Sequence, residues 1–124
     1  MMQMETIRFS NGVVVEVQDK SSVLSGDLYM IHLEIITVVR LDDSDIELRH
    51  YCPSGRLRMT RVLKKSAVHE RDLQEVRKGI RESFLNTNRP YMEHPKFIGR
   101  FKNTCLATYR EQEEKARQAA IHEE

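Results

Sequence analysis

Two polar side chains on one predicted strand are the first candidates for chemistry. His32 and Glu34 are two residues apart, and a β-strand places such residues on the same face. An imidazole beside a carboxylate can act as a general acid–base pair or supply two metal ligands. No third ligand stands at a diagnostic spacing, so the pattern favours a half-exposed polar patch. A small enzyme that uses His32 and Glu34 is therefore our third functional hypothesis, and we expect neither a metal nor a cofactor.

The cysteines do not form a better catalytic pattern. His50 and Cys52 are close in sequence, but a short helix would point the two side chains apart. Cys105 lies on an apolar helical stripe and is expected in the core. The sequence also lacks a glycine-rich phosphate loop and the HExxH and GxSxG motifs. We therefore expect no catalytic residue.

A basic segment in the middle of the chain, residues 56–81, is the strongest candidate for binding. It holds nine Lys and Arg residues against three carboxylates. Such a segment could hold the phosphates of a nucleic acid or another polyanion. No aromatic residues interleave with the arginines, as a base-stacking surface would require. The candidate contacts, which share one strand face or one helix face, are Arg56, Arg58, Lys64, Arg77 and Arg81.

The charge along the chain suggests another role for this segment. Residues 1–48 hold three basic and nine acidic residues, whereas residues 49–110 hold 15 basic and five acidic residues. The last 14 residues are acidic again, with two basic and five acidic residues. The acidic ends of the chain could therefore lie against its basic middle, either within one chain or between subunits.

The N-terminal residues predict a β-hairpin around Asn11-Gly12, a strong turn signal. A two-residue turn would place Glu16 on the apolar face beside Ile7. A three-residue loop instead pairs Ile7 with Val15 and keeps both on that face. We therefore predict a type I turn followed by Gly12 in the left-handed conformation as a bulge.

The strongest strand pattern runs over residues 28–41. One face consists of core-type residues, and the other is polar except for Met30, Ile36 and Val38. A run of 14 extended residues is far longer than an average strand, so it must be bent, bulged or shared between two neighbours. The apolar residues on the second face predict an association surface, most simply that of a homodimer formed through the sheet.

The remaining elements follow from local patterns. Residues 19–27 are polar and read as a loop, and residues 45–51 fit a short helix better than a strand. A strand with a basic outer face follows from Arg56 to Lys64. Helical periodicity then covers residues 69–86, a loop is expected up to Pro90, and a second helical stripe runs over residues 97–109.

Together these elements predict an α+β fold. About four antiparallel strands form a small sheet: the N-terminal hairpin, a long bent third strand and a basic fourth strand. Helices from the C-terminal half cover one of its faces. Residues 1–109 are expected to form one domain, and residues 110–124 an exposed, charged helical tail.

The same features set the functional expectation. No apolar stretch reaches the length of a membrane helix, and no signal peptide is evident, so we expect a soluble cytoplasmic protein with free thiols. Our first hypothesis is a non-catalytic domain that acts by protein–protein association, with itself or with another protein. Nucleic-acid or polyanion binding through residues 56–81 is the second hypothesis.

Overall fold

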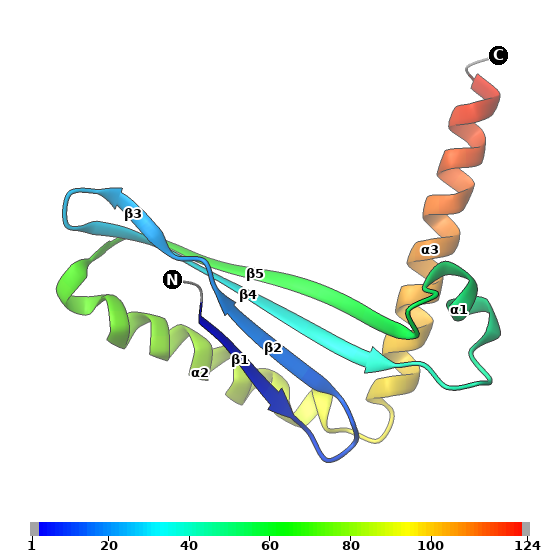
Figure 1. Ribbon diagram of the computed structural model, residues 1–124, viewed down its shortest axis with the longest axis horizontal. Helices are drawn as coiled ribbons and strands as arrows, with labels where there is room; N and C mark the ends of the chain where they lie inside the picture. Colours follow the sequence, from blue (N-terminus) through cyan, green and yellow to red (C-terminus); the bar gives the residue numbers. More distant parts are fainter. Residues whose placement is uncertain (1–2, 123–124) are drawn as a thin grey trace.

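A computed structural model describes residues 3–122 and has the α+β architecture expected from the sequence. Five antiparallel strands form one sheet, and the helices come from the second half of the chain (Figure 1). The elements in chain order are β1 (Gln3–Arg8), β2 (Val14–Asp19), β3 (Ser22–Ser25), β4 (Leu28–Arg40), α1 (Ile46–Tyr51), β5 (Arg56–His69), a 3₁₀ turn (Glu70–Asp72), α2 (Leu73–Met92) and α3 (Phe97–His122). No helix within residues 3–122 is long and apolar enough to cross a membrane.

The β1–β2 hairpin has the predicted register and turn. Ile7 pairs with Val15, and the Phe9 amide donates to the Val13 carbonyl at 2.9 Å. The Gly12 amide closes a type I turn on the Phe9 carbonyl at 3.1 Å, and Gly12 itself has φ +91°. A positive φ at this position lets the bulge restore the strand pairing without steric cost, because glycine has no Cβ.

The long strand is shared between neighbours, which is one of the three alternatives that its length left open. β2 pairs with residues 33–38 of β4, β3 pairs with the start of β4 on the same edge, and β5 pairs along the other edge. The prediction of a simple loop over residues 19–27 is wrong, because Ser22–Ser25 forms β3. This segment is exposed throughout and has no apolar alternation, so only the free edge of β4 beyond β2 makes it a strand.

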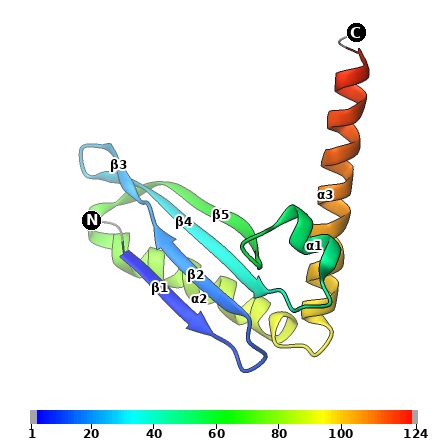
Figure 2. The same ribbon diagram turned by 45° about the vertical axis from the view of Figure 1, so that its right-hand side comes forward.

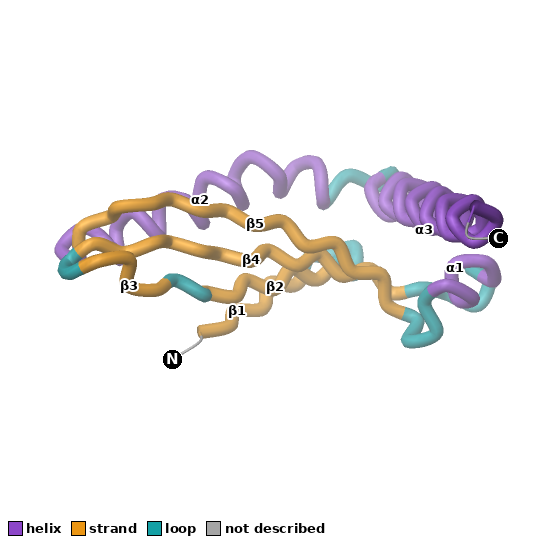
Figure 3. Tube along the Cα trace, turned by 90° about the horizontal axis from the view of Figure 1, so that it is seen from above, coloured by secondary structure: helices purple, strands orange, loops and turns teal. Residues whose placement is uncertain are grey.

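The core lies between the sheet and α2. Figure 3 shows α2 along one face of the sheet and no helix along the other. The buried residues of β4 that face α2 include Ile31, Leu33, Ile35 and Val39. We call the opposite side, formed by the even-numbered residues of β1, β2 and β4 and of β5 up to Lys64, the helix-free face.

Helix α2 is longer than predicted. The expected loop over residues 86–90 is wrong, because the helix continues through Pro90 to Met92. A proline this close to the end of a helix removes one backbone bond and leaves the earlier turns intact. Burial of Met92, which is 4% exposed, and a hydrogen bond to its carbonyl from Asn11 stabilise the extra turn.

Helices α1 and α3 pack together at one end of the sheet. Residues 46–51 are helical, as favoured from the sequence, with Asp45 at the N-cap position. The Tyr109 ring of α3 stacks on Tyr51 of α1 with ring centroids 5.2 Å apart. Beyond this contact α3 projects away from the sheet toward the C-terminus (Figure 2).

Candidate functional site

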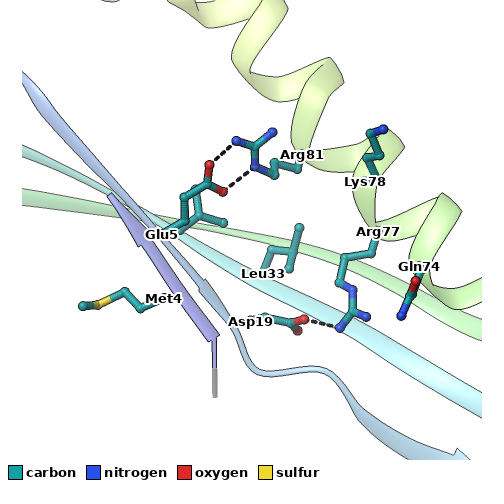
Figure 4. Close-up of a pocket in the computed structure, with 9 residues that line it drawn as sticks. Met4, Glu5, Asp19, Leu33, Gln74, Arg77, Lys78 and Arg81 are labelled. Carbon is teal, nitrogen blue, oxygen red and sulfur yellow. Dashed lines mark hydrogen bonds and ion pairs between the residues drawn. The ribbon is translucent and has the colours of Figure 1, made fainter. Parts of the chain in front are cut away.

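The basic residues predicted as one binding surface lie on two opposite sides of the sheet. Arg56, Arg58 and Lys64 lie on the helix-free face, where strand alternation had grouped them. Arg77 and Arg81 lie on α2 and point toward the opposite face of the sheet (Figure 4). One nucleic-acid backbone therefore cannot contact all five residues along a single flat surface.

Arg77 and Arg81 are paired with the acidic N-terminal part of the chain. Arg77 forms an ion pair with Asp19 of β2, and Arg81 forms a two-point ion pair with Glu5 of β1. These pairs span a pocket of about 650 Å³ between the sheet and α2 (Figure 4). For this part of the basic segment, the structure has the pairing within one chain that the charge distribution suggested.

The environment of Asp19 favours its charged form. Burial opposes ionisation, but hydrogen bonds from the Ser21 side chain and amide, together with Arg77, outweigh it and hold the pKa of Asp19 below its ordinary value. Glu5 in turn raises the pKa of Arg81. The two ion pairs join the edge strand β1 and the end of β2 to α2.

His32 and Glu34 share a strand face, as predicted, but Glu34 is engaged elsewhere. Its carboxylate lies 2.9 Å from Lys20 Nζ and 3.6 Å from His32 Nε2. The bond from Lys20 is the main reason that the pKa of Glu34 is lowered. Within the described part of the chain, no three His, Cys, Asp or Glu residues are grouped as metal ligands. This arrangement is an ion pair on a half-exposed strand face.

The residues predicted for association are largely covered within the single chain. Ile36 and Val38 are 7% and 9% exposed, although the described helices do not run along this face of the sheet (Figure 3). Their cross-strand neighbours on the helix-free face include Glu16 and Arg58. Met30 is half-buried and accepts a hydrogen bond from Ser66. These three side chains therefore offer a partner little exposed apolar area.

The thiols and His50 do not form a catalytic pair. Cys52 Sγ donates to the Arg56 carbonyl at 2.9 Å, whereas the His50 ring contacts Tyr51. Cys105 is buried in the core, and burial raises the pKa of its thiol. A thiol in this environment is less easily ionised than an exposed one.

The outer edge of β5 is a feature that sequence patterns did not indicate. Within residues 3–122, this strand of 14 residues pairs only with β4. The Leu41 amide donates to the Gly55 carbonyl at 2.8 Å, and antiparallel bonding alternates from there. The backbone groups of Leu57, Met59 and the following odd-numbered residues up to Lys65 thus point to β4. Those of the even-numbered residues from Arg56 to Lys64 point outward.

A groove runs beside this free edge, on the side of the sheet that faces α2. It consists of two adjoining hollows of about 710 and 200 Å³ that share Arg61, Phe84 and Asn88. We call it the edge groove. Its apolar lining comes from β4, β5, α2 and the start of α3, and includes Ile35, Met59, Leu63, Val76, Ile80, Phe97 and Phe101. Met59 is 43% exposed, so α2 leaves this border of the sheet partly open.

Small residues of α2 border the same groove. Gly79, Ser83 and Thr87 follow one another at intervals of four residues, which places them along one side of the helix. A mid-helix glycine costs about 1 kcal/mol relative to alanine, and close packing of a neighbour is the usual reason to keep one. Apart from its chain neighbours and the backbone of its own helical turns, no described atom lies within 4 Å of a Cβ added at Gly79. No neighbouring element of the described chain therefore requires a glycine at this position.

The chain matches no protein-family model, no curated protein sequence and no solved structure.

Proposed function

We propose that this chain is a non-catalytic interaction domain that binds an extended segment of another protein as an additional strand on β5. The observation that carries the proposal is the free outer edge of β5 beside the edge groove. Strand addition uses main-chain hydrogen bonds for affinity and pockets for alternate side chains for specificity. Both components occur together along residues 56–65.

The backbone of β5 supplies the first component. Outward-pointing amides and carbonyls of Arg58, Thr60, Val62 and Lys64 form a regular row over about 20 Å of strand. The bulge that pairs Tyr29 with Val68 but Ile31 with Lys65 ends this row at one side. An added strand of about five to seven residues would match the available length.

The edge groove supplies the second component. Every second side chain of an added strand would point to the same side of the sheet as Met59 and Leu63. There it would meet the side of α2 that carries Gly79 and Ser83. The partner is therefore expected to have small or medium apolar residues at alternate positions.

The positive charge of β5 favours a segment of another protein over a second copy of β5 as the added strand. Five residues of this strand are basic, and none of its residues is acidic: Arg56, Arg58, Arg61, Lys64 and Lys65 are the charged members. Two β5 edges side by side would bring like charges together, which destabilises cross-strand pairing. A segment with acidic residues between its apolar positions has the complementary pattern.

We also propose the cytoplasm as the compartment of this domain. Cys52 and Cys105 are both free thiols, which suits a reducing environment.

The test is a selection of random decapeptides on the folded protein, followed by affinity measurements with Val62 variants. Enriched peptides should alternate apolar and acidic residues. Val62→Pro removes an outward amide but no bond to β4, and should weaken binding at least tenfold. Val62→Ala keeps the amide and should bind like the wild type to within about threefold. Circular dichroism checks that both variants fold.

A second variant tests the groove without changing the strand. Gly79→Gln places its Cβ in open space and extends a longer side chain from the lining of the groove, so the fold should be kept while peptide binding falls. Gly79→Ala, which should stabilise α2 by about 1 kcal/mol, is the folding control. Peptides that bind all variants equally would contradict strand addition. So would a wild-type dimer that Val62→Pro converts to monomers, because the occupant would then be a second copy.

A further inference from the structure

Four arginines from three strands lie at one end of the helix-free face. Arg40 of β4 is directly opposite Arg56 of β5. In the next row across the sheet, Arg8 of β1, Val14, Val38 and Arg58 of β5 are successive cross-strand neighbours. Arg56 and Arg58 are about 7 Å apart along their strand. All four arginines are exposed.

These arginines surround a concave part of the surface. A pocket of about 570 Å³ is lined by all four of them, with Val14 and Val38 among its apolar residues and the hairpin loop at its rim. We call it the arginine pocket. Because β-strands hold their side chains in fixed rows, this convergence does not depend on a flexible loop.

The charge of the arginine pocket is not compensated within the described chain. Among the described residues, no carboxylate lies within 4.0 Å of any of the four arginines, whereas Arg77, Arg81 and Arg110 each form an ion pair. Like charges directly across a strand pair are destabilising. The fold therefore keeps several cations together where pairing them would have been more stable.

Two carboxylates also line the arginine pocket. Asp42 is engaged by a hydrogen bond from Ser44, which is the main cause of its lowered pKa, and by Lys102 at 3.5 Å. Glu16, on the floor next to Val14, forms no ion pair within the described residues. Four guanidinium groups against Glu16 leave a strongly positive site.

We propose that the arginine pocket binds clustered phosphate groups without reading bases. Planar guanidinium groups match phosphate oxygens with two parallel hydrogen bonds. The described part of the helix-free face places no Phe or Tyr ring beside them, so a base would have no surface on which to stack. The ligand is then a phosphodiester backbone, recognised independently of sequence, or a free polyphosphate with the same chemistry.

This site is separate from the strand-addition edge. The four arginines of the arginine pocket project from the helix-free face at the hairpin end of the sheet, where Ile98 of α3 also lines the pocket, whereas the edge groove lies on the α2 side and is lined by none of these four arginines. Val62→Pro should therefore leave phosphate binding unchanged, and loss of the arginines should leave the apolar groove intact. The two proposals can fail independently.

Fluorescence anisotropy with a labelled 20-base-pair DNA duplex at about 50 mM salt tests the proposal. The double variant R56A/R58A should bind at least tenfold more weakly, and the salt dependence of binding should fall by about one unit of slope for each phosphate contact removed. R8A/R40A should have a similar effect, which a site made of β5 alone would not produce. The control R71A/R100A removes two exposed arginines elsewhere and should change affinity less than twofold.

Two further arms complete the test. Glu16→Gln removes the unpaired carboxylate and should strengthen binding two- to fivefold. Inorganic tripolyphosphate, measured directly by calorimetry, distinguishes the two sources of phosphate: binding of tripolyphosphate but not DNA assigns a free polyphosphate, and the reverse assigns a nucleic-acid backbone. Failure of both probes to bind at about 50 mM salt would overturn the proposal. So would a loss of affinity in R71A/R100A as large as that in R56A/R58A.

Discussion

The side chain of Asn11 joins the hairpin loop to the end of α2, 81 residues away. Its Nδ2 donates to the Met92 carbonyl at 2.8 Å, while its Oδ1 accepts from the Val13 amide at 3.2 Å. A residue that local sequence explains fully as part of a turn thus also holds a helix terminus. The Met92 carbonyl is one of the groups that a helix end leaves without a helical partner.

This relationship predicts a difference between two substitutions of Asn11. Asn11→Ala loses the bond and should destabilise the fold by about 1 kcal/mol. Asn11→Asp places a carboxylate oxygen against the Met92 carbonyl and should cost more, about 1–3 kcal/mol. Urea denaturation at neutral pH measures both. Asn103→Asp, at an exposed position of α3, is the control and should stay within about 0.5 kcal/mol of the wild type.

The bulge in β5 predicts a stabilising substitution. Ala67 has φ +56°, a left-handed conformation that costs a residue with a Cβ about 1–2 kcal/mol. Ala67→Gly removes that cost. The greater conformational entropy of the unfolded glycine variant in turn lowers the free energy of unfolding by about 0.4–1 kcal/mol. The net expectation is a gain of about 0.5–1 kcal/mol in the free energy of unfolding. Ala107→Gly, in the exposed part of α3, should instead lose about 1 kcal/mol, and equal losses in both variants would contradict a strained Ala67.

The environment of Asp19, with hydrogen bonds from Ser21 and the ion pair with Arg77, predicts a dependence of stability on pH. Because the folded protein holds the pKa of Asp19 below the ordinary value of 3.8, the stabilisation is fully present above that value. It is lost as the pH falls through the lower folded-state pKa. Asp19→Asn should therefore be less stable than the wild type at pH 7, by about 1–2 kcal/mol, and the difference should shrink below pH 4.

Chemical denaturation at several pH values measures this difference. Asp43→Asn is the control, because the Asp43 side chain is fully exposed and its nearest cation is 3.9 Å away. A constant difference between wild type and Asp19→Asn down to about pH 2 would show that the charge of Asp19 is not the source of the stability.

The contacts of α3 predict where truncation begins to matter. Beyond Glu113, the hydrogen bonds and ion pairs of the described residues join only residues of α3 itself. Truncation after Glu114 should leave the melting temperature nearly unchanged. Truncation after Leu106 removes the Tyr109 ring from Tyr51 and should lower it by several degrees. A large fall in melting temperature on truncation after Glu114 would instead indicate that the projecting helix docks on another subunit.

Sequence patterns alone determined the features that depend on neighbouring residues. The parity of Ile7, Val15 and Glu16 selected the three-residue hairpin loop, because only that loop keeps the carboxylate off the apolar face. Alternation along residues 28–41 identified the central strand and its buried side. The same alternation placed Arg56 and Arg58 on one face, so half of the arginine pocket was predictable.

Only the tertiary structure decided the features that depend on distant segments. Arg8 and Arg40 had no pattern in common with Arg56 and Arg58, and the order of the strands brings them together. The polar segment that forms β3 becomes a strand because the free edge of β4 needs hydrogen-bond partners. Pro90 stays helical because Met92 is buried and the Asn11 side chain donates a hydrogen bond to the Met92 carbonyl. The local pattern determines to which side of the sheet a side chain points. Pairing between remote strands determines which side chains become its neighbours, and a binding site requires both.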